Sequence, residues 1–467
     1  MSGSPGSVDV CVVGAGLAGC LAAVKAARLG HKTSVYELRG DTRGGPEWQG
    51  RSINLAMSTR GLTALGSVGL EEKVKEMSVP MYGRMLHASD GATSEQAYGT
   101  SDAQHLLSVS RRQLNELLCD AAEAEPNVTL HFQHKLVSAN MSGLEMAELT
   151  VQDVSAGGDG IPQTVPSSLV VGADGAWSKV RASMQRDVGT RLDFSQDYCP
   201  HSYKELRIPA GDGGTHRLPA NYLHIWPRGE FMLIALPDLG GSFTCTLFIP
   251  HEALARERLD SAEPGQRERV AAFFEREFAD VVPHMPTLLD DFVGNPTLPL
   301  VTIRCAPFHT DNGTAIVLGD AAHAIVPFYG QGCNAAFEDV RVLGELLEKH
   351  TAAPDFKALC SEFTVLRKRN ADAIAELALE HYADMGVSTL STLFLMRRAA
   401  ENAVGRLLSG WYMSEYHMVS FSNIPYADAR ARAIANDGRI NSLVSGAAVL
   451  AGGAALVLGA TVVLKRQ

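Results

Sequence analysis

The chain has 467 residues, more than the roughly 300 at which a single hydrophobic core stops growing, so two or more packed units are expected. Its composition, 46% hydrophobic and 20% charged, is that of a folded globular protein and excludes long disordered tracts. A net charge of -11 without a long basic run argues against nucleic acid as a partner of the whole surface.

The eight cysteines lie singly along the sequence, with no CxxC pair and no cluster with histidine at metal-ligand spacing. This pattern predicts reduced thiols and no metal site, and therefore a reducing compartment such as the cytosol for the bulk of the chain. The first residues, MSGSPGS, lack the charged and apolar regions of a signal peptide, so no export is expected.

The first predicted element is an apolar strand over residues 8–13, followed by a glycine turn and a helix over residues 17–29. The turn has the GxGxxG spacing of dinucleotide sites, formed by Gly14, Gly16 and Gly19. A second strand ends at Glu37, where a carboxylate accepts hydrogen bonds from a ribose 2′-hydroxyl, which disfavours the 2′-phosphate of NADPH at this site. By itself the motif leaves FAD, NAD and a non-catalytic dinucleotide-fold adapter open.

Residues 80–102 are predicted to form a hairpin, because Asp90–Gly91 is a turn signal between two short strand-like segments. A three-residue loop at 90–92 would place Arg84 opposite Tyr98, where a guanidinium and a phenol can share one carboxylate. An ordinary exposed hairpin is the alternative for this segment.

Two later predicted strands each end in a short acidic motif. Residues 168–181 contain a buried-strand pattern that ends in Asp174–Gly175. Residues 315–347 contain another, which ends in Gly319–Asp320 and precedes a Gly/Pro loop and a helix from about Gln331. Because ligands of open α/β sheets bind at the carboxyl edge, the three strand ends predict one ligand site in an α/β fold with a Rossmann-like domain.

The end of the chain carries a different signal. The run from Leu443 to Leu464 is uncharged and has about the ~20 residues that a transmembrane helix needs, so a membrane anchor is predicted, with a buried core helix as the alternative. The predicted domains are a dinucleotide-binding domain over 8–181 and 300–350, an inserted sheet domain over 182–299 that the hairpin at 80–102 joins, a helical region over 351–440, and the tail at 443–464.

The three motifs together resemble those of the p-hydroxybenzoate-hydroxylase-like flavoprotein monooxygenases, which implies FAD as the cofactor. Further segments, including "GRSINLAMSTRGLTALGSVGL", "NYLHIWPRGEFMLIALP", "GDAAHAIVPFYGQG" and "HMVSFSNIPY", closely resemble the kynurenine 3-monooxygenase family over almost the whole chain. The resemblance implies NADPH-driven hydroxylation of L-kynurenine to 3-hydroxykynurenine in tryptophan catabolism, through a flavin C4a-hydroperoxide and without a catalytic acid or base from the protein. It also implies attachment to the mitochondrial outer membrane, with the catalytic part facing the cytosol.

Two alternatives to this function stay open at the level of sequence. One is another single-component aromatic hydroxylase, which differs in the ring that it accepts. The other is a non-catalytic flavoprotein-fold membrane adapter, which would keep GxGxxG without needing the GD loop and the hydroxylase segments.

The resemblance also assigns residues to the ligands. It places Arg84 and Tyr98 at the substrate carboxylate and His381 at a polar substrate contact, where the family usually has asparagine. The other substrate-binding residues that it implies are Tyr416, Leu223, Ile234, Leu236, Phe248, Pro327, Phe328 and Gln331. The FAD-binding residues, predicted from the motifs or implied by the resemblance, are Gly14, Gly16, Leu17, Gly19, Glu37, Ala56, Arg111, Leu136, Asp174, Gly175, Gly319, Asp320, Gly332, Cys333 and Asn334. In this assignment Asp320 bonds the ribityl and pyrophosphate region, and the helix after Gly332 directs its positive end at the flavin.

Overall fold

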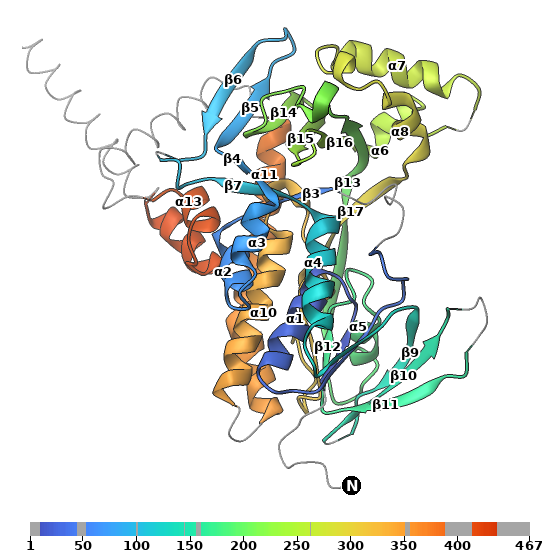
Figure 1. Ribbon diagram of the computed structural model, residues 1–467, viewed down its shortest axis with the longest axis vertical. Helices are drawn as coiled ribbons and strands as arrows, with labels where there is room; N and C mark the ends of the chain where they lie inside the picture. The colour runs from blue at the N-terminus through green and yellow to red at the C-terminus, as the bar shows by residue number, and fades with distance from the viewer. Residues whose placement is uncertain are drawn as a thin grey trace, which may run out of the picture.

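The computed structural model describes residues 10–43, 53–99, 101–143, 145–155, 160–261, 263–350, 355–387 and 413–436. These residues form two bodies, which lie one above the other in Figure 1. The lower body contains a five-stranded parallel sheet and the upper body a seven-stranded sheet. This arrangement agrees with the expectation of more than one packed unit.

The parallel sheet has the strand order β18-β12-β1-β2-β8. Its strands are short, and every residue of the apolar strands β1, β12 and β18 is buried, because helices cover the sheet. The bounds are Val10–Val13 for β1, Thr33–Tyr36 for β2, Val128–His131 for β8, Leu169–Gly172 for β12 and Ala315–Val317 for β18. Since β18, β12 and β1 are parallel neighbours, the predicted convergence of the three motifs at one carboxyl edge is confirmed.

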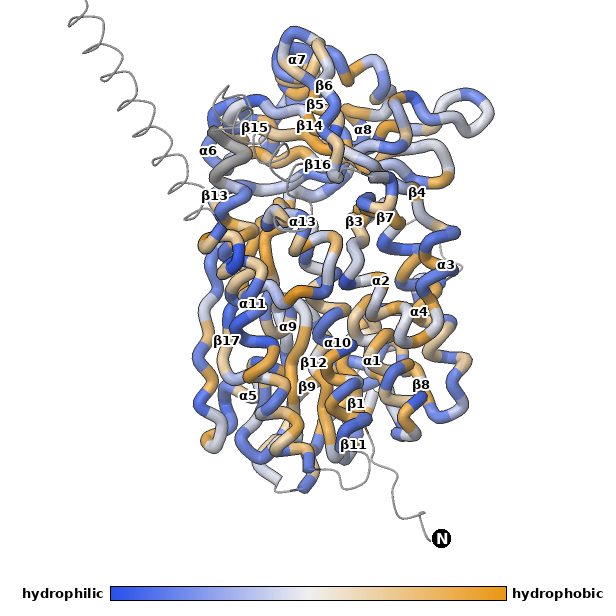
Figure 2. Tube along the Cα trace, turned by 90° about the vertical axis from the view of Figure 1, so that its left-hand side faces the viewer, coloured by the Kyte–Doolittle hydropathy of each residue, from blue (hydrophilic) through white to orange (hydrophobic). Residues whose placement is uncertain are grey.

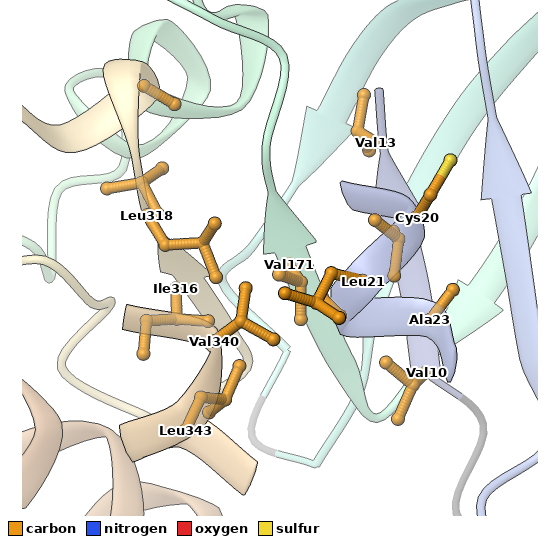
Figure 3. Packing of buried hydrophobic residues seen from close by; sticks show 14 of the residues in the cluster. Val10, Val13, Cys20, Leu21, Ala23, Val171, Ile316, Leu318, Val340 and Leu343 are labelled. Carbon is orange, nitrogen blue, oxygen red and sulfur yellow. The ribbon is translucent and has the colours of Figure 1, made fainter. Parts of the chain in front are cut away.

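Helices α1 (Leu17–Arg28) and α10 (Gly332–Lys349) cover the parallel sheet. Figure 3 shows the packing: Val10 of β1 and Val171 of β12 lie near Leu21 of α1, and Val340 of α10 lies beside them. Figure 2 shows hydrophobic residues concentrated along these interior strands. The remaining helices of this body are α2 (Thr59–Gly66), α3 (Glu71–Glu76), α4 (Arg111–Glu123), α5 (Lys179–Met184) and α9 (Asp320–His323).

Two small antiparallel sheets extend this lower body. One, in the order β3-β7-β4, consists of Asn54–Met57, Leu106–Ser110 and Ser78–Met81. The other, in the order β11-β10-β9, consists of Gln163–Ser167, Ala147–Asp153 and His134–Asn140. The first of them lies between the two bodies in Figure 1.

The seven-stranded sheet has the order β17-β13-β16-β15-β14-β5-β6. Its strands are Asp193–Ile208 (β13), Tyr222–Arg228 (β14), Phe231–Pro237 (β15), Phe243–Pro250 (β16), Thr297–Ala306 (β17), Gly83–His87 (β5) and Thr93–Ala97 (β6). The hairpin β5–β6 enters this sheet because β5 pairs with β14 in parallel. The expected domain boundary at residues 299 and 300 falls inside β17, whose Cys305 packs in the core of the lower body.

The two faces of the seven-stranded sheet pack against different partners. One face forms a core with α6 (His251–Arg256), α7 (Gln266–Glu277) and α8 (Leu288–Gly294). The other face, which includes Ile225 and Phe248, packs against the turn Pro327–Tyr329 and the helices α11 (Phe356–Val387) and α13 (Glu415–Ser420). This second face therefore packs against segments that follow the GD motif in the sequence.

Among the described residues, no helix is both long and apolar enough to cross a bilayer. The transmembrane segment predicted at 443–464 lies outside the described residues.

Candidate functional site

The glycine turn after β1 is shaped by two close approaches. Gly14 has a φ of +101°, and a Cβ at this position would lie 2.6 Å from the carbonyl oxygen of Ala173. A Cβ at Gly19 would lie 1.9 Å from the carbonyl oxygen of Gly14, so α1 packs directly on the turn. Gly16 is exposed, and a Cβ there would meet nothing within 4 Å. The start of α1 is therefore open to an incoming pyrophosphate, which its free backbone N–H groups attract.

Glu37 lies beside this turn. Its Oε2 accepts a hydrogen bond from the backbone N–H of Ala15 at 2.8 Å, and its Oε1 accepts one from the N–H of Arg39 at 2.9 Å. The carboxylate is thus fixed next to the opening at Gly16 and is only partly buried. Its bond to a ribose hydroxyl stays a prediction, but the carboxylate is in place for it.

Asp174 of the DG motif has a structural task that the sequence pattern did not indicate. Its Oδ2 accepts hydrogen bonds from the backbone N–H groups of Lys179 at 2.6 Å and Val180 at 3.2 Å, at the start of α5. Burial raises the pKa of Asp174, and its Oδ1 is buried without a hydrogen-bond partner in the described structure. One oxygen therefore holds the helix start and the other is left for a ligand or water.

The GD motif packs between two helices. Gly319 has a φ of +55°, and a Cβ there would lie 3.1 Å from the Cβ of Ala336 in α10 and 3.8 Å from the Cβ of Ala18 in α1. Its backbone N–H donates to Oδ2 of Asp339 at 2.9 Å. Asp320 follows as the exposed first residue of α9. The GD motif and the glycine turn therefore meet at the same helix pair.

Asn334 joins the start of α10 to the strand β3. It is fully buried; its Oδ1 accepts from the N–H of Ser58 at 2.9 Å, and its Nδ2 donates to the carbonyls of Ala56 at 2.9 Å and Gly330 at 3.0 Å. Gly332 is the first residue of α10. The amide group of Asn334 thus has its hydrogen-bond partners within the protein. It holds Ala56 beside the positive end of a long helix.

The last expected cofactor positions divide into two groups. Burial raises the pKa of Cys333 to about 12, and the nearby charges of Arg111 and Asp320 modify it in opposite directions, so these three side chains lie near one another. Leu17 is half-buried at the start of α1. Leu136, by contrast, is a core residue of the lower body that pairs with Val151. Because its side chain is in the core, Leu136 would contact a cofactor through backbone atoms.

The hairpin register differs from the prediction by two residues. Arg84 pairs with Gln96, and the loop is 89–91, because the N–H of Ala88 donates to the carbonyl of Ala92 at 2.8 Å. Asp90 and Gly91 decide this: the Asp90 carboxylate accepts from the N–H of Ala92, and Gly91 takes a φ of +83°. Because side chains alternate with a period of two, the shift keeps Tyr98 on the same face as Arg84.

Arg84 lies beside two aromatic rings, and we call Arg84, Tyr98 and Tyr416 together the carboxylate seat. Its guanidinium carbon is 5.1 Å from the ring centre of Tyr416 and 5.7 Å from that of Tyr98, and the two rings stack at 5.7 Å. Nε of Arg84 and the hydroxyl of Tyr98 are buried without a hydrogen-bond partner. Among the described residues, the groups that act electrostatically on Arg84 are Tyr416 and Tyr98, and not a carboxylate. Burial raises the pKa of Tyr98, which keeps the phenol a neutral donor. This seat offers a cation and a hydroxyl to an anion.

An apolar wall adjoins the seat. Phe248 of β16 lies 4.9 Å from Phe328, measured between ring centres. Leu236 is in a buried cluster with Tyr98, and Leu223 and Ile234 pack against both this cluster and the one that contains Phe248. Pro327 begins the turn that carries Phe328. The sequence-predicted wall residues therefore surround one region.

His381 and Gln331 have identified neighbours. The imidazole of His381 lies 5.0 Å from the ring of Tyr329, which in turn lies 6.0 Å from the ring of Tyr416. Tyr329 therefore lies between His381 and the seat, and the substrate contact of His381 stays a prediction. Gln331 is buried, and its Oε1 accepts a hydrogen bond from the hydroxyl of Tyr426 at 2.9 Å, so this amide carbonyl already has a protein partner.

Comparison with known proteins identifies the group to which this arrangement belongs. A family model described as FAD binding domain matches residues 7–198 and 251–375. The kynurenine 3-monooxygenase of Myxococcus xanthus is 42% identical over 94% of this chain and 91% of its own length. The chain belongs to the kynurenine 3-monooxygenase family. The family member from Dictyostelium discoideum is 40% identical over 94% of this chain and 93% of its own.

The solved structures support the same fold at greater distance. The tetrameric form of 2-methyl-3-hydroxypyridine-5-carboxylic acid oxygenase superposes with a TM-score of 0.65 at 19% identity, over 83% of this chain and 95% of that one. At this identity the likeness establishes the fold alone. The family model gives FAD as the cofactor. The open helix start and the constrained glycines fit this cofactor, and the contact of FAD with Gly16 stays a prediction.

This member of the kynurenine 3-monooxygenase family also contains a buried ion network that the sequence analysis missed. Asp339 accepts from Nε2 of His323 at 2.5 Å and from Nε of Arg367 at 2.6 Å; Arg367 also donates to Glu338 at 2.7 Å, and Glu338 pairs with Arg60 at 2.9 Å. The opposing cations hold the pKa of Asp339 down, to about 2, against the effect of burial.

The network connects the two halves of the site. At one end Asp339 holds the N–H of Gly319 in the GD motif. At the other end Nε of Arg60 donates to the carbonyl of Val419 at 3.0 Å, three residues after Tyr416. The adjacent acidic residues in the apolar helix segment "NAAFEDVRVL" were the available signal, because buried carboxylates require cationic partners.

Proposed function

We propose that this chain hydroxylates L-kynurenine to 3-hydroxykynurenine, with FAD as cofactor and NADPH and O₂ as co-substrates. Membership of the kynurenine 3-monooxygenase family supports the reaction. The observation in the structure that carries the proposal is the guanidinium of Arg84, whose buried Nε has no hydrogen-bond partner and which lies beside two stacked tyrosine rings. Kynurenine supplies both the carboxylate that this seat needs and an aromatic ring.

The seat binds the substrate carboxylate in this proposal. A buried cation without a counter-ion is costly, and a carboxylate that enters the seat removes that cost while accepting a hydrogen bond from the Tyr98 hydroxyl. The phenol of Tyr98 is neutral and can donate a hydrogen bond, and the guanidinium of Arg84 beside the Tyr416 ring is positive. Both groups favour an anionic ligand. The amino-acid end of kynurenine is thereby fixed.

The apolar wall then receives the aromatic ring. Leu223, Ile234 and Phe248 come from the upper sheet, and Phe328 comes from the turn before α10. Together they position the ring and exclude water from it. His381 offers a polar group at the edge of this space.

The cofactor, when bound, supplies the activated oxygen for the aromatic ring. The amino group of kynurenine already donates electrons to the carbon that is hydroxylated, so the protein need not provide a strong base. The residues of the chain therefore act by binding, orienting and excluding water, and the start of α10 contributes a positive potential at the flavin edge.

We also propose that residues 443–464 anchor the protein in the mitochondrial outer membrane, with the catalytic part in the cytosol. The support is the uncharged, apolar composition of this run and its length. Deleting it should move the protein from the membrane fraction to the soluble fraction with its NADPH oxidation intact. Extraction of the full chain at high pH without detergent would contradict the anchor.

The test of the reaction is direct. The purified full chain should be yellow, should oxidise NADPH faster when L-kynurenine is present, and should yield a product heavier by one oxygen atom. A panel of anilines and phenols should be poorer substrates, because they lack the amino-acid carboxylate. Absence of bound flavin, or of a hydroxylated product, would overturn the proposal.

A further inference from the structure

A side chain of the helix α13 is hydrogen-bonded to the backbone of Tyr98, directly after the hairpin strand β6. His417 follows Tyr416 directly, and its Nε2 lies 2.8 Å from the backbone carbonyl oxygen of Tyr98. Its Nδ1 lies 2.9 Å from Oγ of Ser414, the N-cap residue of the helix, and Oγ of Ser414 accepts from the N–H of His417. The imidazole thus bridges the first turn of α13 and the hairpin.

These partners determine the tautomer of the ring. A carbonyl oxygen has no proton to donate, so Nε2 of His417 carries the hydrogen that is given to Tyr98. Nδ1 then accepts from the hydroxyl of Ser414. Because each ring nitrogen has a hydrogen-bond partner, the orientation of the ring is fixed. Its Nε2–H is the group that bonds to the hairpin.

The bridge acts where the two tyrosines meet. Tyr98 and His417 are 319 residues apart in sequence, yet the rings of Tyr98 and Tyr416 stack at 5.7 Å with the guanidinium of Arg84 beside both. Phe421 closes the same cluster, 5.6 Å from His417 and 6.0 Å from Tyr416 between ring centres. The bond to the Tyr98 backbone therefore joins the two elements that carry the two rings.

We infer that His417 is a positioning residue for the substrate carboxylate. It does not reach the substrate; it sets the spacing of Tyr98 and Tyr416 on Arg84, and so determines how well the seat fits an amino-acid carboxylate. This inference rests on the proposed function for the identity of the substrate. Loss of the bridge raises KM and the dissociation constant for L-kynurenine, while turnover at saturation and FAD binding stay unchanged.

Two substitutions separate the two bonds of the imidazole. In His417→Gln, the amide nitrogen lies as many bonds from Cα as Nε2 does, so the donation to Tyr98 is retained. In His417→Asn, the polar atoms lie where Nδ1 was, so the bond to Ser414 is retained and the bond to Tyr98 is lost. We expect His417→Gln to match the parent, and His417→Asn to raise KM and Kd for L-kynurenine about three- to ten-fold, the value of one neutral hydrogen bond.

A matched control is available in the loop before β14. Nε2 of His216 also donates to a backbone carbonyl, that of Asp238, at 2.8 Å, and it lies outside the seat. His216→Asn removes the same kind of bond and should leave KM and Kd unchanged. If His417→Asn fails to retain FAD, His417→Thr replaces it, because threonine can keep the bond to Ser414 and is too short to reach Tyr98.

The outcomes distinguish this inference from the proposed function. NADPH oxidation gives KM and kcat, and the change in flavin absorbance on adding L-kynurenine gives Kd. Equal KM values for the Gln and Asn variants, whether normal or raised, overturn the positioning role, since helix capping alone would not tell the two apart. If Arg84→Met also leaves KM unchanged, the carboxylate seat itself is wrong; if Arg84→Met raises KM, the inference about His417 fails alone.

Discussion

Arg84 combines burial, positive charge and the lack of a protein counter-ion in the described structure. Burial removes hydration from this cation, and the neighbouring Tyr416 and Tyr98 offset that loss, so the pKa of Arg84 lies above its usual value. A ligand anion adds the counter-ion that the described residues do not provide. The two tyrosine rings lessen the cost through their negative faces.

Arg84→Met keeps the length of the side chain and removes its charge. Truncating one partner of a desolvated charge pair costs about 2 to 5 kcal/mol, so KM for L-kynurenine should rise roughly 30-fold or more while FAD stays bound. Steady-state NADPH oxidation measures the change. An analogue without the carboxylate should lose little more in the variant, since both changes remove one interaction; additive losses would place the carboxylate elsewhere.

Tyr98→Phe isolates the hydroxyl of the seat. A hydrogen bond to a charged group contributes about 1.5 to 3 kcal/mol, so Kd for L-kynurenine should rise about ten-fold or more. Because burial raises the pKa of Tyr98, the phenol stays protonated at neutral and mildly alkaline pH, and the ratio of variant to parent Kd should be constant there. Titration of flavin absorbance at several pH values tests this. A ratio that falls toward one as the pH rises would show an ionising phenol instead.

At the scale of an element, the turn between β1 and α1 contains one glycine that the fold requires and another that only ligand binding requires. Gly19 is required by the fold, because a Cβ there would lie 1.9 Å from the carbonyl of Gly14. Gly16 has an ordinary φ of -72° and open space around its Cα. The fold does not require a glycine at position 16, whereas close approach of a pyrophosphate does.

The two glycines therefore predict opposite defects. Gly16→Ala should leave the thermal unfolding temperature of the flavin-free protein unchanged and weaken the retention of FAD. Gly19→Ala should lower that temperature, because α1 must move away from the turn. Differential scanning calorimetry of the apoprotein and flavin content after gel filtration separate the two effects. Equal unfolding temperatures for the two variants would contradict the assignment.

The elements of the nucleotide site were predictable because their signals are local. The apolar strands, the glycine spacing and the acidic strand ends each occupy a few adjacent residues. The predicted hairpin register was wrong by two residues. The hydrogen bond that the Asp90 carboxylate accepts from Ala92 and the positive φ of Gly91 determine the position of the loop. Asn334 and His417 bridge partners 276 and 319 residues away. Such bonds depend on tertiary packing, which the local pattern does not encode.

At the scale of the whole molecule, a buried histidine pair makes stability depend on pH. Nε2 of His87 lies 2.8 Å from Nδ1 of His224, whose Nε2 donates to the carbonyl of Pro219 at 2.8 Å. Burial lowers the pKa of each ring to about 4, so both are neutral at neutral pH. Asp280 and Arg228 also face His87 and act in opposite directions. The pair joins β5 to β14 within the upper sheet.

The sign of this effect follows from proton uptake. In the unfolded chain the two imidazoles bind protons near pH 6.5, the usual value, while in the folded protein they bind them near pH 4. Stability should therefore fall as the pH falls from about 6.5 to about 4. The double variant His87→Gln with His224→Gln should show a shallower slope of unfolding free energy against pH in this window. An unchanged slope would mean that the pair does not contribute.

Arg60 has a consequence for how the chain is made in the cell. Its guanidinium is fully buried and donates to the carbonyl of Val419, which is 359 residues later in the chain. During synthesis the N-terminal part emerges first. The charge of Arg60 in α2 therefore has no partner until α10 has been made, and its hydrogen bonds are completed only with the last described helices. A message cut short after the codon for Asp320 would encode the three strand-end motifs and still yield a polypeptide that quality control must hold or degrade.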